Sequence, residues 1–117
     1  MGLPETWNLK PSFIMWVAVL PIHLLIPGSR SLKDRRQAVR SLKERIKTRF
    51  DAACSEVGDL DTWNRAFLGL ALVANEKPVL QDMASEIARY AQNDAHVQVT
   101  GVDKDFLNYG DVAGFVP

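Results

Sequence analysis

SLKDRRQAVRSLKERIKTRF (Ser31–Phe50) is the stretch around which we expect the fold to be organised. Its apolar residues recur at helical spacing: Leu32, Val39, Leu42 and Ile46. Residues at that spacing share one face of a helix, and such a face needs a surface to pack against. Ser31 is a favourable N-cap residue for this helix. The stretch therefore predicts one long amphipathic helix packed on the rest of the chain.

The same stretch holds most of the basic charge. From Arg30 to Arg49 there are nine basic and two acidic residues, a net charge of +7, although the whole chain sums to zero. Five of these residues follow steps of three and four and so lie along one flank of the predicted helix: Lys33, Arg36, Arg40, Lys43 and Lys47. One interpretation is a solvated helix surface, and the other is a docking surface for a polyanion such as RNA.

Length and composition limit the protein class. A chain of 117 residues predicts one domain, and its single cysteine, Cys54, excludes an internal disulfide. We expect Cys54 to be a small core residue. Two histidines and one cysteine do not form a zinc motif, so no metal or cofactor is expected. The apolar run 13–26 is shorter than a membrane span and predicts a buried strand, which makes a cytoplasmic protein without membrane attachment the default expectation.

The order of elements predicts the fold. Residues 1–12 have no periodicity and are interpreted as a flexible extension, residues 13–105 as a single domain, and residues 106–117 as a tail. Within the domain we expect strands at 13–25, 51–57, 63–74 and 96–102, with a second helix from a cap at Asn75 to Asn93. The resulting β-α-β-β-α-β order is typical of an α+β, ferredoxin-like fold, with two helices on one face of a four-stranded antiparallel sheet.

The expected strand order in that sheet is 4-1-3-2. The first and third strands are apolar at nearly every position, which is typical of central strands covered on both faces. Pro21 interrupts the first strand, and because proline cannot donate a backbone hydrogen bond, we expect a bulge or one-sided pairing there.

The predicted topology brings several polar residues to one edge of the sheet. They are His23, Ser31, Lys33, Glu56, Asp61 and Arg65. Helix N–H groups at this edge would favour an anion, and Glu56 and Arg65 are placed to pair across the hairpin turn. His23 is more often a hydrogen-bonded strand residue than a catalyst. No serine has an evident base partner and no glycine-rich phosphate loop is present, so no catalytic residue is assigned.

A family resemblance adds to this interpretation. It is carried by PGSRSLKDRR (27–36), VRSL (39–42), RF (49–50), EVG (56–58), DTWNRA (61–66) and LG (68–69). These motifs resemble the YlxP-like family, a small bacterial domain family of unknown function, from Met15 to about Asp105. The resemblance implies a ferredoxin-like fold and genes beside those for transcription and translation factors, including a ribosome-binding factor. Pro21, Ala52 and Ala53 depart from the family pattern, which affects expected strand geometry rather than membership.

Three functional hypotheses follow. The first is a non-enzymatic RNA- or ribosome-associated protein whose basic helix contacts phosphates, while Trp63 stacks on a base. Its expected contacts are Arg30, Lys33, Arg36, Arg40, Lys43 and Trp63. The second is a homodimer or higher oligomer that uses the apolar sheet face as its interface. The third is a small-anion-binding protein or enzyme at the edge that holds His23, Lys33, Glu56 and Arg65.

Overall fold

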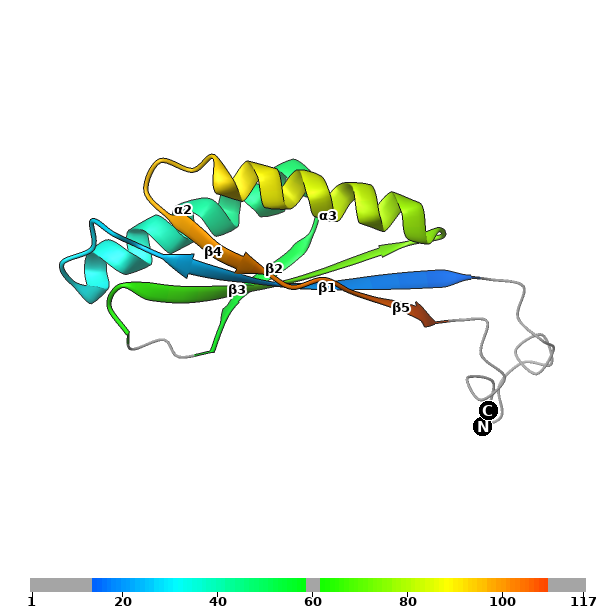
Figure 1. Ribbon diagram of the computed structural model, residues 1–117, viewed down its shortest axis with the longest axis horizontal. Coiled ribbons are helices and arrows are strands. Elements are labelled where there is room, and N and C mark those ends of the chain that lie inside the picture. Colours follow the sequence, from blue (N-terminus) through cyan, green and yellow to red (C-terminus); the bar gives the residue numbers. More distant parts are fainter. Residues whose placement is uncertain (1–13, 59–61, 110–117) are drawn as a thin grey trace, which may run out of the picture.

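The computed structural model describes residues 14–58 and 62–109 of the chain. The elements follow in this order: β1 (Met15–Leu25), α2 (Leu32–Phe50), β2 (Ala53–Val57), β3 (Arg65–Ala74), α3 (Lys77–Gln92), β4 (Gln98–Val102) and β5 (Asp105–Tyr109). Both helices lie on the same side of one sheet and run in opposite directions along it (Figure 1). The predicted ferredoxin-like, α+β plan is confirmed.

Every strand pair in the sheet is antiparallel, and the order is β2-β3-β1-β4. This is the predicted 4-1-3-2 order viewed from the other side. β1 and β3 are the central strands and pair along ten residues, from Trp16 opposite Ala74 to Leu25 opposite Arg65. β5 was not predicted and pairs with the first half of β1, whereas β4 pairs with the second half.

Pro21 explains why the last strand is divided. Its carbonyl oxygen accepts a hydrogen bond from the Asp103 N–H at 3.0 Å. In an antiparallel ladder the N and the C=O of one residue point to the same neighbour, so the missing N–H of Pro21 also faces this neighbour. The ladder breaks there, with β4 ending opposite Ile22 and β5 beginning opposite Val19. The expected one-sided pairing at Pro21 is confirmed, and a bulge lies further along at Thr100.

The predicted C-terminal tail requires a correction. Residues 106–109 belong to β5 and continue the sheet, so they are not part of a tail. The reason is that Phe106 packs against the core opposite Ala18, although its neighbours in the strand are exposed. The extension 1–12, Asp61 and residues 110–117 lie outside the described residues.

The core lies between the helices and one face of the sheet. The buried strand residues that point to the helices are Ala18, Leu20, Ile22 and Leu24 in β1, and Ala66, Leu68, Leu70 and Leu72 in β3. The other face, here called the open face, is formed by the odd-numbered residues of β1 and β3 and the residues paired with them. None of those odd-numbered residues is fully buried. Within a single chain, the described residues therefore do not cover β1 and β3 on both faces as predicted, because both helices occupy one side.

The ends of both helices follow from local chemistry. The Ser31 side chain caps α2 by accepting from the Asp34 N–H, as the sequence predicts. Asp51 ends α2 in the left-handed conformation (φ 50°), which turns the chain into β2. The cap of α3 is Glu76 rather than the predicted Asn75, and it forms no side-chain cap bond. Neither helix of the described residues combines the length and apolar character required to cross a bilayer.

Cys54 lies in the core under α2, with only 7% of its surface exposed. Burial raises the pKa of its thiol from 9.0 to about 11, against the opposing effect of Lys43 and Lys47. Because the thiolate is the reactive form, we predict that Cys54 reacts slowly with a thiol reagent at pH 8 in the folded protein and rapidly in denaturant. The rate of thiol labelling, monitored by absorbance in the presence and absence of urea, measures this difference. Equal rates in the two conditions would contradict the buried position.

Candidate nucleic-acid interface

The orientation of α2 is fixed by one buried stripe. Its buried residues are Arg35, Val39, Leu42 and Ile46, which recur every three or four positions and face the sheet. Since successive residues rotate by about 100°, the direction of every other side chain on α2 follows from this stripe.

The basic row predicted from the sequence lies on the flank of α2 that faces β2. We call Lys33, Arg36, Arg40, Lys43 and Lys47 the basic flank. Lys43 and Lys47 act electrostatically on Cys54 in β2, which places this flank above the β2 edge of the sheet. Arg45 marks the opposite flank, because its guanidinium contacts Tyr90 and Asp94 at the end of α3.

The basic flank is open to solvent and carries little compensating charge. Lys33, Arg36, Arg40 and Lys47 are exposed, and Lys43 is half-buried. Lys43 lies 3.8 Å from the Glu44 carboxylate, whereas the other four make no ion pair with any described residue. A row of long cations with this exposure retains its positive potential, and that potential attracts an anionic partner.

The loop before α2 carries Arg30 and is bonded to the backbone at Trp63 and Asn64. The Ser29 hydroxyl donates to the Trp63 carbonyl at 2.6 Å, and the Ile26 N–H donates to the Asn64 carbonyl at 2.8 Å. These bonds hold the turn before β3 against the loop before α2. The Trp63 side chain remains 52% exposed. Arg30 is exposed, and its backbone N–H donates to the Asp34 carboxylate at 3.1 Å.

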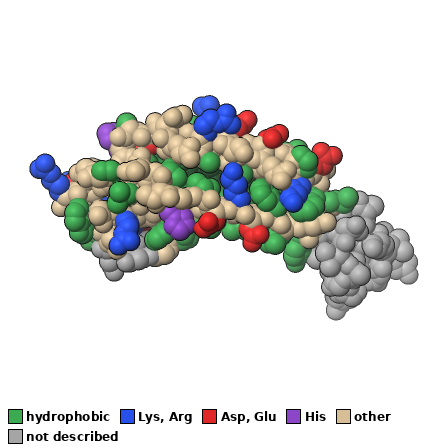
Figure 2. All heavy atoms as spheres, viewed as in Figure 1, with side chains coloured by type: hydrophobic (Ala, Val, Ile, Leu, Met, Phe, Trp, Pro, Cys, Tyr) green, Lys and Arg blue, Asp and Glu red, His purple; other side chains and the backbone are tan. Residues whose placement is uncertain are grey.

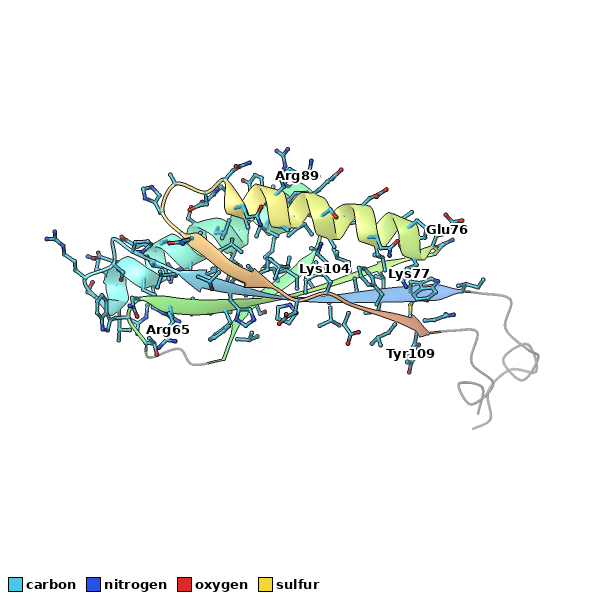
Figure 3. The ribbon with its side chains drawn as sticks, viewed as in Figure 1. Arg65, Glu76, Lys77, Arg89, Lys104 and Tyr109 are labelled. Carbon is cyan, nitrogen blue, oxygen red and sulfur yellow. The ribbon has the colours of Figure 1, made fainter. Side chains whose placement is uncertain are left out.

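The predicted Glu56–Arg65 pair is replaced by a different one. The Arg35 guanidinium, on a residue only 1% exposed, donates to Glu56 Oε1 through Nη2 and to the Arg65 carbonyl oxygen through Nε at 2.8 Å. Arg65 itself sends its side chain to the open face, away from the helices (Figure 3). The reason is strand parity: Glu56 pairs with Leu68 and faces the helices, whereas Arg65 alternates to the other side.

The other predicted edge residues do not form one site. His23 lies on the open face, where its Nε2 is 3.2 Å from Asp103 Oδ2 and its ring packs edge-on against Phe67. Ser31 and Lys33 lie at the start of α2, on the helix side of the sheet. The sheet therefore separates His23 from Lys33 and Glu56. Within residues 14–58 and 62–109 no three potential metal-ligating side chains gather together.

A groove of about 310 Å³ lies between the first turns of α2 and the loop before β4. Its polar lining comes from Ser29, Asp34, Gln37, Ser41 and His96, and none of the basic-flank residues reaches it. Its one acidic group, the Asp34 carboxylate, already accepts from the Arg30 N–H. The groove therefore offers an anion far less positive charge than the basic flank does.

Sequence reasoning missed the contact that joins the two helices. Asp94 Oδ1 accepts from Arg45 Nη2, and Asp94 Oδ2 accepts from the N–H groups of His96 and Val97 at 2.8 and 3.0 Å. Burial alone would raise the Asp94 pKa, but these hydrogen bonds together outweigh it and lower the pKa below its ordinary value. The Asn93-Asp94 turn after α3 was the available signal, since an aspartate there accepts from the backbone N–H groups that follow it.

Comparison with known proteins identifies relatives of uncharacterised function. A family model described as "Protein of unknown function (DUF503)" matches residues 17–104, from the beginning of β1 to the junction of β4 and β5. The "Uncharacterized protein YlxP" of Bacillus subtilis (strain 168) is 32% identical over 53 residues, which are 45% of this chain. The match spans 58% of the length of that relative. Neither description names a ligand, a partner or a reaction.

Removing the buried guanidinium tests how α2 is held. We predict that Arg35→Met lowers the free energy of unfolding by about 3 kcal/mol, because Glu56 and the Arg65 carbonyl lose their donor. Urea denaturation measures the change. Arg36→Met removes a neighbouring exposed cation and is the matched control, with little expected effect. Equal stability of Arg35→Met and the native protein would show that the pair does not anchor α2.

The Asp94 contact predicts a specific dependence of stability on pH. A carboxyl group whose pKa is lowered by folding stabilises the protein at pH values above its ordinary pKa of 3.8. This contribution is lost as the pH falls through the lower pKa of the folded state. Asp94→Asn should therefore reduce stability at pH 7 and reduce it less at pH 3. Thermal unfolding at both pH values tests this, with the exposed Asp82→Asn as control. A loss that is the same at both pH values would contradict the assignment.

Proposed function

This chain belongs to the DUF503 family of proteins of unknown function, and we propose that it is a non-enzymatic RNA- or ribosome-associated protein that binds phosphates through the basic flank of α2. One observation carries the proposal: four of the five basic-flank side chains are exposed and make no ion pair with a described residue. Cations arranged in this way supply the sequence-independent part of nucleic-acid affinity.

The second helix provides a comparison within the same molecule. The exposed residues of α3 include Asp82, Glu86 and Arg89, so its surface carries both acidic and basic side chains. Figure 2 shows this face of the molecule, where Lys and Arg side chains are interspersed with Asp and Glu rather than gathered into one patch. A helix whose charges serve only solubility resembles α3. The single-signed flank of α2 differs from that pattern and favours an anionic partner.

The dimensions of the basic flank favour a chain of phosphates over a single small anion. From Lys33 to Lys47 the axial distance is about 21 Å, and neighbouring members of the row are about 5–6 Å apart. Trp63 and Arg30 extend the surface beyond the start of α2. Proteins stack unpaired bases on exposed aromatic rings near cationic surfaces, and the half-exposed indole of Trp63, whose carbonyl is bonded to Ser29 just before α2, would serve in this way.

Two further arguments shape the proposal. The separation of His23 from Lys33 and Glu56 by the sheet removes the arrangement on which the enzyme hypothesis depended, which favours a binding role. The ribosome enters through the gene neighbourhood that the family resemblance implies. The cations of the basic flank suit either free RNA or the RNA surface of a ribosomal particle.

Binding at several salt concentrations tests the proposal. For five single-strand phosphate contacts, the logarithm of the affinity should fall against the logarithm of the salt concentration with a slope of about −3.5. Arg36→Glu/Arg40→Glu removes two contacts, so we predict a slope of about −2 and an affinity lowered at least tenfold. Filter binding or fluorescence anisotropy with total RNA, and co-sedimentation with ribosomal subunits, measure both quantities.

The control reverses the same number of charges elsewhere. Arg89→Glu/Lys104→Glu alters two exposed cations on α3 and beside β4 (Figure 3), so its affinity should fall much less than that of the flank variant. Circular dichroism establishes that both variants fold. Equal losses of affinity in the two variants would show that only net charge matters, which would contradict a specific role for the basic flank. The absence of binding by the native protein at moderate salt would overturn the proposal.

A further inference from the structure

The open face carries a continuous apolar patch across three strands. The strand register places Val17 of β1 between Leu107 of β5 and Val73 of β3, and it places Val19 next to Ala71. Their side chains point to the same side of the sheet, away from both helices. Figure 3 shows Tyr109 on that side as well. Val73 is 62% exposed and Val19, on the central strand, is 38% exposed. A patch of aliphatic side chains at the middle of a sheet face is therefore in contact with solvent.

The position of this patch is unusual for a single chain. A central strand normally has both faces shielded or presents polar residues on the second face. Asp105 is the charged residue of the open face that lies near this patch. Arg65 and the His23–Asp103 pair lie toward the other end of the sheet. Contact between such an aliphatic surface and water costs free energy in proportion to the exposed area, and covering it with another apolar surface removes that cost.

The size of the open face matches a protein–protein interface. β1 has 11 residues, so the face is about 36 Å long at about 3.3 Å per residue. Four strands at about 4.8 Å make it about 19 Å wide at most, and the shorter outer strands reduce the footprint to about 600 Å². Side chains roughen this surface, so its accessible area exceeds the footprint and approaches the roughly 800 Å² that each partner contributes to a stable complex.

We propose that a second copy of this chain covers the open face, with sheet packed on sheet in a two-fold dimer. Such an interface is self-complementary because the same apolar patch is buried on both subunits, and aligned packing of two sheets is a common arrangement. The charges permit it: the chain has a net charge of zero, and the basic flank lies on the helix side of the sheet, so two such flanks remain on opposite outer surfaces.

Charge disfavours a dimer formed through the β2 edge of the sheet. β2 is an edge strand, and within residues 14–58 and 62–109 no strand pairs with its outer edge, on which a second β2 would add. The basic flank lies above that edge, so edge pairing would bring ten cationic side chains from two copies together. Repulsion between like charges opposes this arrangement, whereas packing through the open face avoids it.

The mass in solution tests the proposal. The chain has a mass of 13.1 kDa, so sedimentation equilibrium of the full chain at about 50 µM should give a mass near 26 kDa. Val73→Asp places a charge on the patch at a position exposed within one chain, and we expect it to shift the mass to that of one chain without loss of helical content. Leu107→Asp is a second, independent variant on the same face and should give the same result.

Matched controls make the outcome decisive. Val79→Asp changes an exposed valine on α3, 44% exposed, and should leave the dimer intact. A native protein that sediments as one chain overturns the proposal. If removal of residues 1–13 then produces a dimer, the N-terminal segment of the same chain is the occupant instead. A dimer that persists in both Val73→Asp and Leu107→Asp uses another surface and also overturns it. Because neither variant alters α2, failure here leaves the RNA proposal untouched.

Discussion

The contact of the Arg35 guanidinium with Glu56 and with the Arg65 carbonyl is the interaction on which the arrangement of α2 depends. A charge that is 1% exposed is costly unless every neighbouring group is placed to satisfy it, so the contact allows one rotation and one register of the helix over β2 and β3. At that rotation Val39, Leu42 and Ile46 enter the core. The same rotation turns the other basic residues of α2 outward.

Two separate surfaces result from this arrangement. The helix layer presents the basic flank above the β2 edge, and the sheet presents its aliphatic open face on the opposite side. Because the sheet lies between them, an anionic chain on α2 and a second subunit under the sheet do not compete for the same residues. A two-fold dimer would instead carry two basic flanks on one particle, and two linked binding surfaces raise the apparent affinity for a long polyanion.

The sequence predicts the fold well because apolar periodicity and strand order are local or topological properties, and Pro21 even indicates where the ladder is interrupted. It predicts the site only in part. The basic flank follows from helical spacing, but sequence reasoning includes Arg35 only in the net charge of the stretch, although it occupies a position of the buried stripe, four residues before Val39. The supposed edge cluster failed because strand parity, which needs the register, places His23 and Glu56 on opposite faces.

Cross-linking of the protein to RNA, read out residue by residue by mass spectrometry, tests the central claim most directly. A radical or ultraviolet cross-link reports which side chains touch RNA, independently of how charge reversal changes affinity. We predict cross-links at Lys33, Arg36, Arg40 and Trp63, and far fewer on α3. Cross-links concentrated on α3 or on the open face, at equal occupancy, would contradict the assignment of the basic flank as the RNA-binding surface.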